Sequence, residues 1–384
     1  MLSTTVFLWI LVSFFNIKIS HLRAGLKNKT LWLCYSFFAF TVFSALLSQN
    51  KTEAAFSLEV KLSFLLFPYL FFCFEWPPAI LKRCVISFVS GCFFACLYLI
   101  ARALVYVANG QPEYLFYTLF SDLIHASYFS MYLILAIIFV LLLYRNWFHT
   151  QKSVIYSSYF FVSIFIATIF LCSSKLGMIS FFTCLPLALL YKWREHLNFK
   201  VITVFTVGLL VILILMIKVF PESFSRLNSL KILSSQNIDK TSGESTTVRI
   251  LIWEQSMELI KHNWLMGTGV GDANDELYKR YERNGLLGAS KHHLNAHNQF
   301  FQTFIGAGIV GFLILLTFTV GKLVYAIRRR KIILFLFTLL IIMNFMVESM
   351  LQTSAGVFFF VFFLCFFRLA DESELADGAA MNPY

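Results

Sequence analysis

Polar residues able to do chemistry stand at the end of one long polar segment, directly before an apolar run. Residues 291–299 read KHHLNAHNQ, and His297 could serve as a general base, because a neutral imidazole accepts a proton from a hydroxyl group. Arg249, earlier in the same segment, could bind phosphate oxygens in pairs, since its guanidinium is planar and always charged. The ordinary alternatives are an interfacial histidine and a solvated surface arginine. The pattern favours proton transfer beside an anion at a membrane edge.

Other polar residues lie where apolar runs begin or end. Lys175 interrupts apolar sequence at an expected outer membrane edge, where a charge is costly unless it is paired or functional. Snorkelling of its side chain toward water is the simple alternative. His125 and Tyr128 open one apolar run and Glu348 closes another on the same expected side. These three residues could face one outer cavity.

Metal and nucleotide sites are not expected. His293 and His297 could bind zinc as a helical pair four residues apart, but no carboxylate lies between Glu282 and His297 to act as a third ligand. The eight cysteines include no CxxC pair, and none lies in the polar segment. The glycines at 267, 269 and 271 lack the GxGxxG spacing, so we expect a helix-ending turn, with an anion-binding nest as the alternative. We therefore expect neither a metal nor another cofactor.

Composition indicates a chain dissolved in lipid. Of the 384 residues, 59% are hydrophobic and 13% are charged, whereas soluble domains have about 25% charged residues. The apolar residues form continuous runs of membrane-spanning length, which excludes the alternating strands of a barrel. The net charge of +11 comes from short Lys and Arg clusters between apolar runs, so nucleic acid is not an expected partner. The sequence predicts an all-α polytopic membrane protein.

Eleven spans are expected, and the basic clusters on alternate connections place one side in the cytoplasm. The domains expected from this pattern are N-terminal transmembrane helices (1–219), a large outer loop (220–296), C-terminal transmembrane helices (297–370) and a disordered cytoplasmic tail (371–384). The expected spans are 2–17, 30–48, 56–74, 84–107, 122–143, 153–172, 175–191, 200–219, 297–326, 331–348 and 353–369.

Within the loop, residues 220–247 are expected to be a flexible lead-in. An amphipathic helix should follow at 248–263, with Thr246 or Thr247 as its N-cap. A second helix at 273–284 carries Arg280. Small residues between Gly306 and Gly311 should allow close helix packing in the next span.

Four short motifs occur in a recognisable order. They are RILIW at 249–253, GTG at 267–269, HNQ at 297–299 and GIVG at 308–311. Together with the large loop and the topology, this series resembles the superfamily of O-antigen ligases and O-antigen polymerases. The similarity covers about residues 120–365 and is strongest over 248–312. The resemblance implies a twelve-helix membrane glycosyltransferase with a large periplasmic loop.

The resemblance also implies an activity and its site. By position, Arg249, Lys175 and His297 would be catalytic, although Lys175 departs from the arginine more usual in the family and lacks its bidentate fork. Substrate-binding positions would be Asn298, His125, Tyr128, Glu348 and Arg280. The implied reaction is metal-independent, inverting transfer of a glycan from undecaprenyl diphosphate to an acceptor sugar, such as the lipid A core. It would take place at the periplasmic face of the bacterial inner membrane.

Two alternatives remain open at the level of sequence. A polymerase of the same family would use the same groups to join two carrier-linked repeats. A glycolipid transporter or flippase would do no covalent chemistry, and the charged pair Glu59 and Lys61 within one expected span is the best indication of that class.

Overall fold

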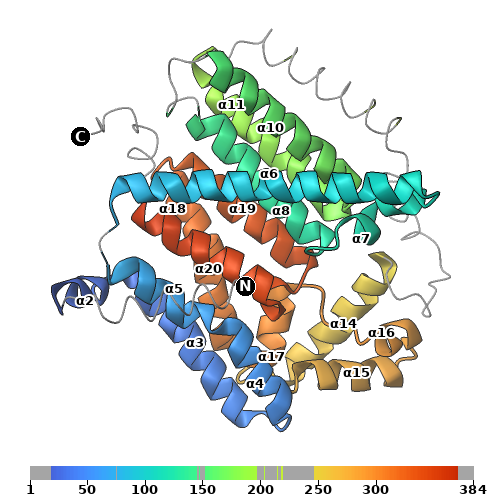
Figure 1. The fold of residues 1–384 in the computed structure, drawn as a ribbon. Coiled ribbons are helices and arrows are strands. Elements are labelled where there is room, and N and C mark those ends of the chain that lie inside the picture. Colours follow the sequence, from blue (N-terminus) through green and yellow to red (C-terminus); the bar gives the residue numbers. More distant parts are fainter. Residues whose placement is uncertain are drawn as a thin grey trace. The chain divides into compact units, whose positions relative to one another are not determined.

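The computed structural model describes residues 19–74, 76–144, 152–196 and 246–370, together with positions 147, 203, 214 and 218. These residues form helices joined by turns, without strands (Figure 1). The chain divides into two units that are discontinuous in sequence. The first unit comprises Met1–Leu81, Ser235–Lys322 and Phe345–Asp371, and the second comprises Lys82–Ser234, Leu323–Asn344 and Glu372–Tyr384.

Nine of the expected spans coincide with apolar helices in the described part of the chain. Six helical stretches are long and apolar enough to cross a membrane, and three further apolar helices are shorter. This confirms an all-α polytopic membrane protein. The expected spans 2–17 and 200–219 lie outside the described residues, apart from isolated positions, as do the tail and most of the loop's lead-in. The helices of the membrane part are α2 (Ile19–Gly25), α3 (Lys29–Leu47), α4 (Lys51–Lys61), α5 (Ser63–Phe72), α6 (Pro78–Ala108), α7 (Tyr117–Phe120), α8 (Ala126–Phe139), α10 (Lys152–Leu171), α11 (Lys175–Lys192), α17 (Gln299–Leu316), α18 (Lys322–Arg328), α19 (Ile332–Val347) and α20 (Ser354–Leu369), with short 3-10 or π turns η1 (Pro112–Leu115), η2 (Val140–Tyr144), η3 (Arg194–His196), η5 (Thr317–Gly321) and η6 (Met350–Gln352).

An aromatic core holds the membrane helices of the first unit together. Phe64 of α5 lies 4.7 Å from Phe37 of α3 and 6.1 Å from Phe360 of α20, measured between ring centroids. Phe318 of η5, directly after α17, contacts all three rings. Tilted and edge-to-face aromatic contacts of this kind add to the free energy of burial. The core therefore fixes α3, α5, α17 and α20 against one another.

The loop forms a small helical layer in the first unit. It contains α14 (Thr246–His262), α15 (Ala273–Arg283) and α16 (Leu287–Lys291). Ile252 of α14 and Leu277 of α15 are fully buried together, so the prediction of an amphipathic helix followed by a second helix is confirmed. The prediction of a threonine N-cap is wrong, because α14 already includes Thr246 and Thr247.

The glycine turn after α14 is joined to α17 by main-chain hydrogen bonds. The N–H groups of Thr268 and Gly269 donate to the carbonyl oxygens of Ile305 and Gly306, at 2.7 and 3.1 Å. Gly308 has φ of 59° and interrupts the helical geometry of α17. A Cβ atom at Gly308 would overlap the backbone of Leu265, so glycine is required for this close approach. The small residues thus serve contact between loop backbone and helix as well as helix packing.

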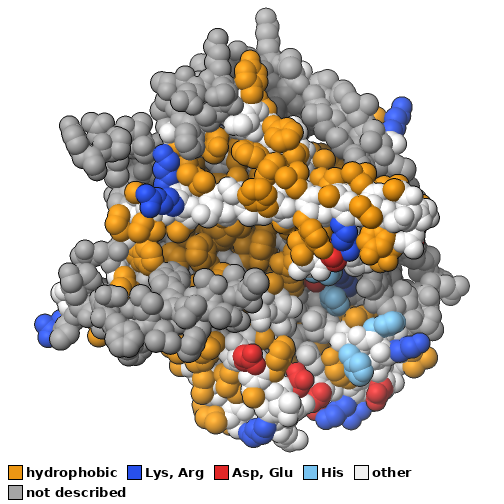
Figure 2. Space-filling view, viewed as in Figure 1, with side chains coloured by type: hydrophobic (Ala, Val, Ile, Leu, Met, Phe, Trp, Pro, Cys, Tyr) orange, Lys and Arg blue, Asp and Glu red, His pale blue; other side chains and the backbone are white. Residues whose placement is uncertain are grey.

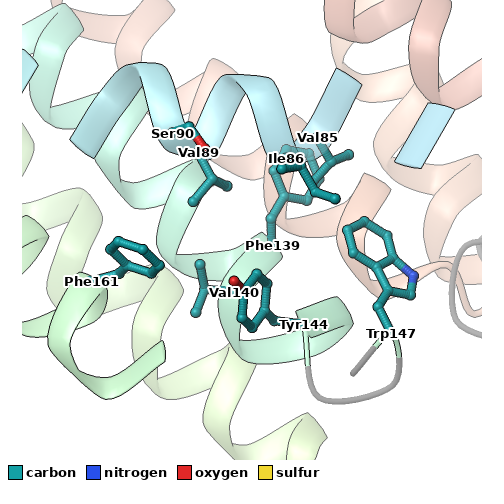
Figure 3. A pocket seen from close by; sticks show the side chains of 9 residues that line it. All are labelled: Val85, Ile86, Val89, Ser90, Phe139, Val140, Tyr144, Trp147 and Phe161. Carbon is teal, nitrogen blue, oxygen red and sulfur yellow. The ribbon is translucent and has the colours of Figure 1, made fainter. Parts of the chain in front are cut away.

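In the second unit, α8 is packed closely against α11. Gly177 of α11 leaves room for Ser130 of α8, and the hydroxyl groups of Ser127 and Ser174 lie 3.1 Å apart. A cavity of about 60 Å³ lies among α6, α8, η2 and α10 and is lined mainly by apolar side chains, with Ser90 as an exception (Figure 3). It has no charged lining residue, so it is not a candidate for the predicted chemistry.

Candidate functional site

The segment between α16 and α17 carries both candidate histidines. It is not helical, and His293 and His297 have φ angles of 48° and 43°, in the left-handed region. The zinc-binding pair, which the sequence did not favour, therefore lacks the helix that it would need. The ring of His293 packs against Tyr278 at 5.0 Å, and no group of three metal-binding side chains occurs among the described residues. His297 is left as the candidate for chemistry.

Hydrogen bonds from three directions hold the backbone around His297. The N–H of Ala296 donates to Oε1 of Gln302 at 3.0 Å, and the carbonyl oxygen of Ala296 accepts from Nε1 of Trp253 at 3.1 Å. The N–H of His297 donates to Oδ1 of Asn295 at 2.9 Å. A left-handed φ at a residue other than glycine is costly and persists only where its surroundings enforce it. These contacts supply that enforcement for the backbone at His297.

The two residues after His297 tie this segment to residues 346–351. Asn298 is the N-cap of α17: its Oδ1 accepts from the N–H of Phe301 at 3.1 Å, and its Nδ2 donates to the carbonyl oxygen of Met346 at 3.0 Å. Oε1 of the buried Gln299 accepts from the N–H of Leu351 at 2.6 Å. The start of α17 and the end of α19 are therefore fixed together, which places Glu348 beside His297.

Glu348 lies between the two candidate catalytic groups of the loop. Its Oε1 is 3.2 Å from Nη2 of Arg249, and its Oε2 is 3.6 Å from Nδ1 of His297. Glu348 is buried, with 8% of its surface exposed, while the side chains of Arg249 and His297 retain 34% and 21%. Arg249 also donates from Nη1 to the carbonyl oxygen of Val347 at 3.1 Å, at the end of α19. A carboxylate therefore bridges a guanidinium and an imidazole.

This arrangement favours one tautomer of the imidazole. Nδ1 of His297 is buried and accepts or donates no hydrogen bond, and Glu348 is the carboxylate in front of it. A carboxylate beside one ring nitrogen favours the tautomer that carries its proton there and leaves the other nitrogen as the base. Nε2 is then the nitrogen available to a substrate hydroxyl group. The geometry fits general base catalysis, with Glu348 stabilising the imidazolium that forms.

The other predicted residues are placed as follows. Arg280 lies half-buried on α15 of the first unit, and no hydrogen bond or ion pair of the described residues joins its side chain to His297. Lys175 is the first residue of α11, and His125 is the N-cap of α8, with its ring 5.6 Å from that of Tyr128. Lys175, His125 and Tyr128 all belong to the second unit. That they meet the residues of the loop stays a prediction.

The glycine turn cannot act as an anion nest. Besides the bonds of Thr268 and Gly269 to α17, the N–H groups of Val270 and Gly271 donate to the hydroxyl oxygens of Ser44 and Ser48, each at 3.0 Å. The N–H of Gly267 donates within the chain to Asn263 at 2.8 Å. No N–H group of 267–271 is left for a phosphate, so the structure contradicts the nest alternative.

Sequence reasoning missed the residues that position the site. Gln299 and Gln302 are nearly fully buried, and Trp253 is half-buried. The available signal was their type and place, since two glutamines at the start of a membrane-length apolar run are costly to bury without hydrogen-bond partners. Figure 2 shows charged and histidine side chains over the part of the molecule that contains the loop helices, where this site lies.

A protein-family model described as O-antigen ligase matches residues 160–316. The matched stretch includes Lys175, Arg249 and His297, and it ends within α17. No curated protein sequence matches the chain. Residues 160–316 of this multi-pass membrane protein are therefore similar to the O-antigen ligase family.

Proposed function

We propose that this protein is a glycosyltransferase that moves a glycan from a polyprenyl diphosphate carrier to an acceptor sugar. In the specific form of the proposal, the carrier is undecaprenyl diphosphate, the acceptor is the lipid A core, and the reaction takes place at the periplasmic face of a bacterial inner membrane. The observation that supports it most is the buried carboxylate of Glu348, which bridges Arg249 and His297.

In this proposal His297 acts as the general base. Nε2 takes the proton of an acceptor hydroxyl group while the hydroxyl oxygen forms a bond to the anomeric carbon. The bond between that carbon and the carrier phosphate breaks, and its electron pair leaves with the diphosphate. Because attack and departure occur on opposite faces, the anomeric centre inverts. Glu348 stabilises the positive charge that the proton brings to His297.

The leaving diphosphate gains negative charge in the transition state and requires fixed cations. Arg249 supplies one, since two of its five N–H groups are engaged by Glu348 and Val347 and three remain. Lys175 is proposed as the second cation, with Asn298 in a positioning role through its two hydrogen bonds. Because protein cations neutralise the diphosphate, the reaction is proposed to need no metal.

The test is transfer by purified protein in lipid nanodiscs. The protein is incubated with carrier-linked glycan and rough lipopolysaccharide, with a chelator present, and the product is followed as a heavier glycolipid. We expect transfer by the wild type and a loss of about 10²–10⁴-fold in His297→Ala, the usual contribution of a general base. His293→Ala is the matched control, because this histidine shares the segment but packs against Tyr278.

Retained activity in His297→Ala would refute the base, and equal loss in both variants would indicate damage to the segment instead. A polymerase would use the same groups on two carrier-linked repeats, so the acceptor decides between the two activities. A deletion strain that accumulates polymer on the carrier supports the ligase. A strain whose lipid A carries a single repeat supports the polymerase.

A further inference from the structure

Lys61 is a buried cation of the first unit that the proposed reaction does not use. It ends α4, and 4% of its surface is exposed. Its Nζ donates to Oγ of Ser57 at 2.8 Å and approaches the carbonyl oxygen of Ser57 at 3.5 Å. No ion pair joins Lys61 to a carboxylate of the described residues, and Glu59 is exposed. An ammonium group buried without a counterion is strongly unfavourable.

A small cavity lies beside this ammonium group. Its volume is about 20 Å³, and its lining includes Lys61, Thr41, Thr303 and Gln352 from four segments of the unit. A space of this size holds one water-sized occupant. This size favours a small anion over a diphosphate or a carboxylate with its attached carbon chain.

The hydrogen-bonding groups around the cavity favour an acceptor of hydrogen bonds. Oγ1 of Thr303 already accepts from Nε2 of Gln299 at 2.9 Å, so its hydroxyl proton is free to donate. The side-chain amide of Gln352 makes no hydrogen bond within the described residues and offers further N–H groups. The hydroxyl of Thr41 is committed to the carbonyl oxygen of Phe37 at 2.8 Å. The lining of the cavity thus includes Lys61 and two residues with uncommitted donors, and it includes no carboxylate.

We propose that this cavity binds a halide ion, chloride under ordinary conditions. Chloride accepts several hydrogen bonds without a preferred direction and supplies the negative charge that Lys61 lacks. Its binding would also stabilise the region of the candidate site. Thr303 is bonded to Gln299, and Gln299 accepts from the N–H of Leu351, three residues after Glu348. The halide site does not depend on the proposed activity.

The test is thermal unfolding of the purified full-length protein at constant ionic strength, with chloride or bromide replacing gluconate. A ligand that binds the folded state raises Tm, and at concentrations above Kd the rise is proportional to the logarithm of the ligand concentration. We expect Tm to rise by about 3–6 °C over the titration. Lys61→Met should show no rise. Lys322→Met is the matched control, because Lys322 lies in the same unit but donates to Oγ1 of Thr30 at 3.1 Å, and it should respond as the wild type does.

A second measurement keeps the proposal testable if Lys61→Met does not fold. Crystals of the wild type grown in bromide should show an anomalous peak in contact with Nζ of Lys61. A wild-type Tm that is the same in chloride and in gluconate overturns the proposal. So does an equal rise in Lys61→Met, or bromide density absent from the cavity.

Discussion

Glu348→Gln changes the charge between Arg249 and His297 with almost no change in shape. In the wild type, the carboxylate faces Nδ1 of His297 at 3.6 Å. In the proposed mechanism it stabilises the imidazolium that forms when the acceptor loses its proton. Coulomb's law with an effective dielectric constant of about 20 gives roughly 4–5 kcal/mol for unit charges at this distance. Partial exposure of the ring and a hydrogen bond to the glutamine oxygen, worth about 1 kcal/mol, reduce this to about 2–4 kcal/mol.

A loss of about 2–4 kcal/mol of transition-state stabilisation corresponds to a decrease in kcat of about 30–1000-fold, since 1.4 kcal/mol is a factor of ten. The assay is initial-rate transfer in nanodiscs with donor and acceptor varied separately. In the proposed mechanism Glu348 acts through His297 in the transition state, so kcat should fall while KM for the donor changes little. Glu254→Gln is the control, because Glu254 is an exposed carboxylate of α14, the helix that carries Arg249.

Two results would refute this reasoning. Activity of Glu348→Gln within threefold of the wild type would show that the carboxylate does not stabilise the imidazolium. A rise in donor KM with unchanged kcat would show that Glu348 acts only by holding Arg249. Thermal unfolding of each variant, measured alongside, separates both from a loss of folded protein.

Three further variants test other parts of the structure. Arg249→Lys keeps the charge but lacks the planar fork whose two nitrogens bond Val347 and Glu348. We expect about 10–100-fold lower kcat/KM for the donor, from one lost charged hydrogen bond. Wild-type kinetics would show that the reaction does not need the guanidinium. Gly308→Ala should lower the free energy of unfolding by more than about 3 kcal/mol, because the added Cβ overlaps Leu265 and alanine is strained at a positive φ. An unchanged Tm would show that stability does not need the close approach of Leu265 to residue 308. Tyr281→Phe should leave the free energy of unfolding unchanged or raise it by up to about 1 kcal/mol in denaturant unfolding. The buried hydroxyl of Tyr281 has no partner among the described residues, and burial raises the pKa of Tyr281, which keeps the hydroxyl neutral. A large loss of stability would show that the hydroxyl has a partner.

Much of the fold could be predicted from the sequence because lipid imposes strong local constraints. Each spanning segment must satisfy its own backbone, so hydropathy alone locates the helices. The amphipathic period of α14 likewise predicted which face is buried in the loop. Thr246 and Thr247 were wrongly assigned as caps because a helix start is the least constrained part of such a pattern.

The site could be predicted only in part. Arg249 and His297 were identified by type and place, and both contact Glu348. The bridging position of Glu348 could not be predicted, since it depends on the hydrogen bonds of Asn298 and Gln299 to residues about 50 positions away. The anion nest failed for the same reason. Ser44 and Ser48 occupy its N–H groups from more than 200 positions away, and no local motif carries that information.

The joint between the glycine turn and α17 has a consequence for how such a protein diversifies. It is made of main-chain atoms, with N–H groups of Thr268 and Gly269 bonded to Ile305 and Gly306 and the N–H of Ile309 bonded to Trp264. Main-chain bonds are the same for every residue type other than proline. Substitutions on the outer surface of the loop can therefore change that surface while the attachment of the turn to α17 persists. Surface side chains of the loop can change in evolution because the attachment depends only on main-chain atoms and glycine.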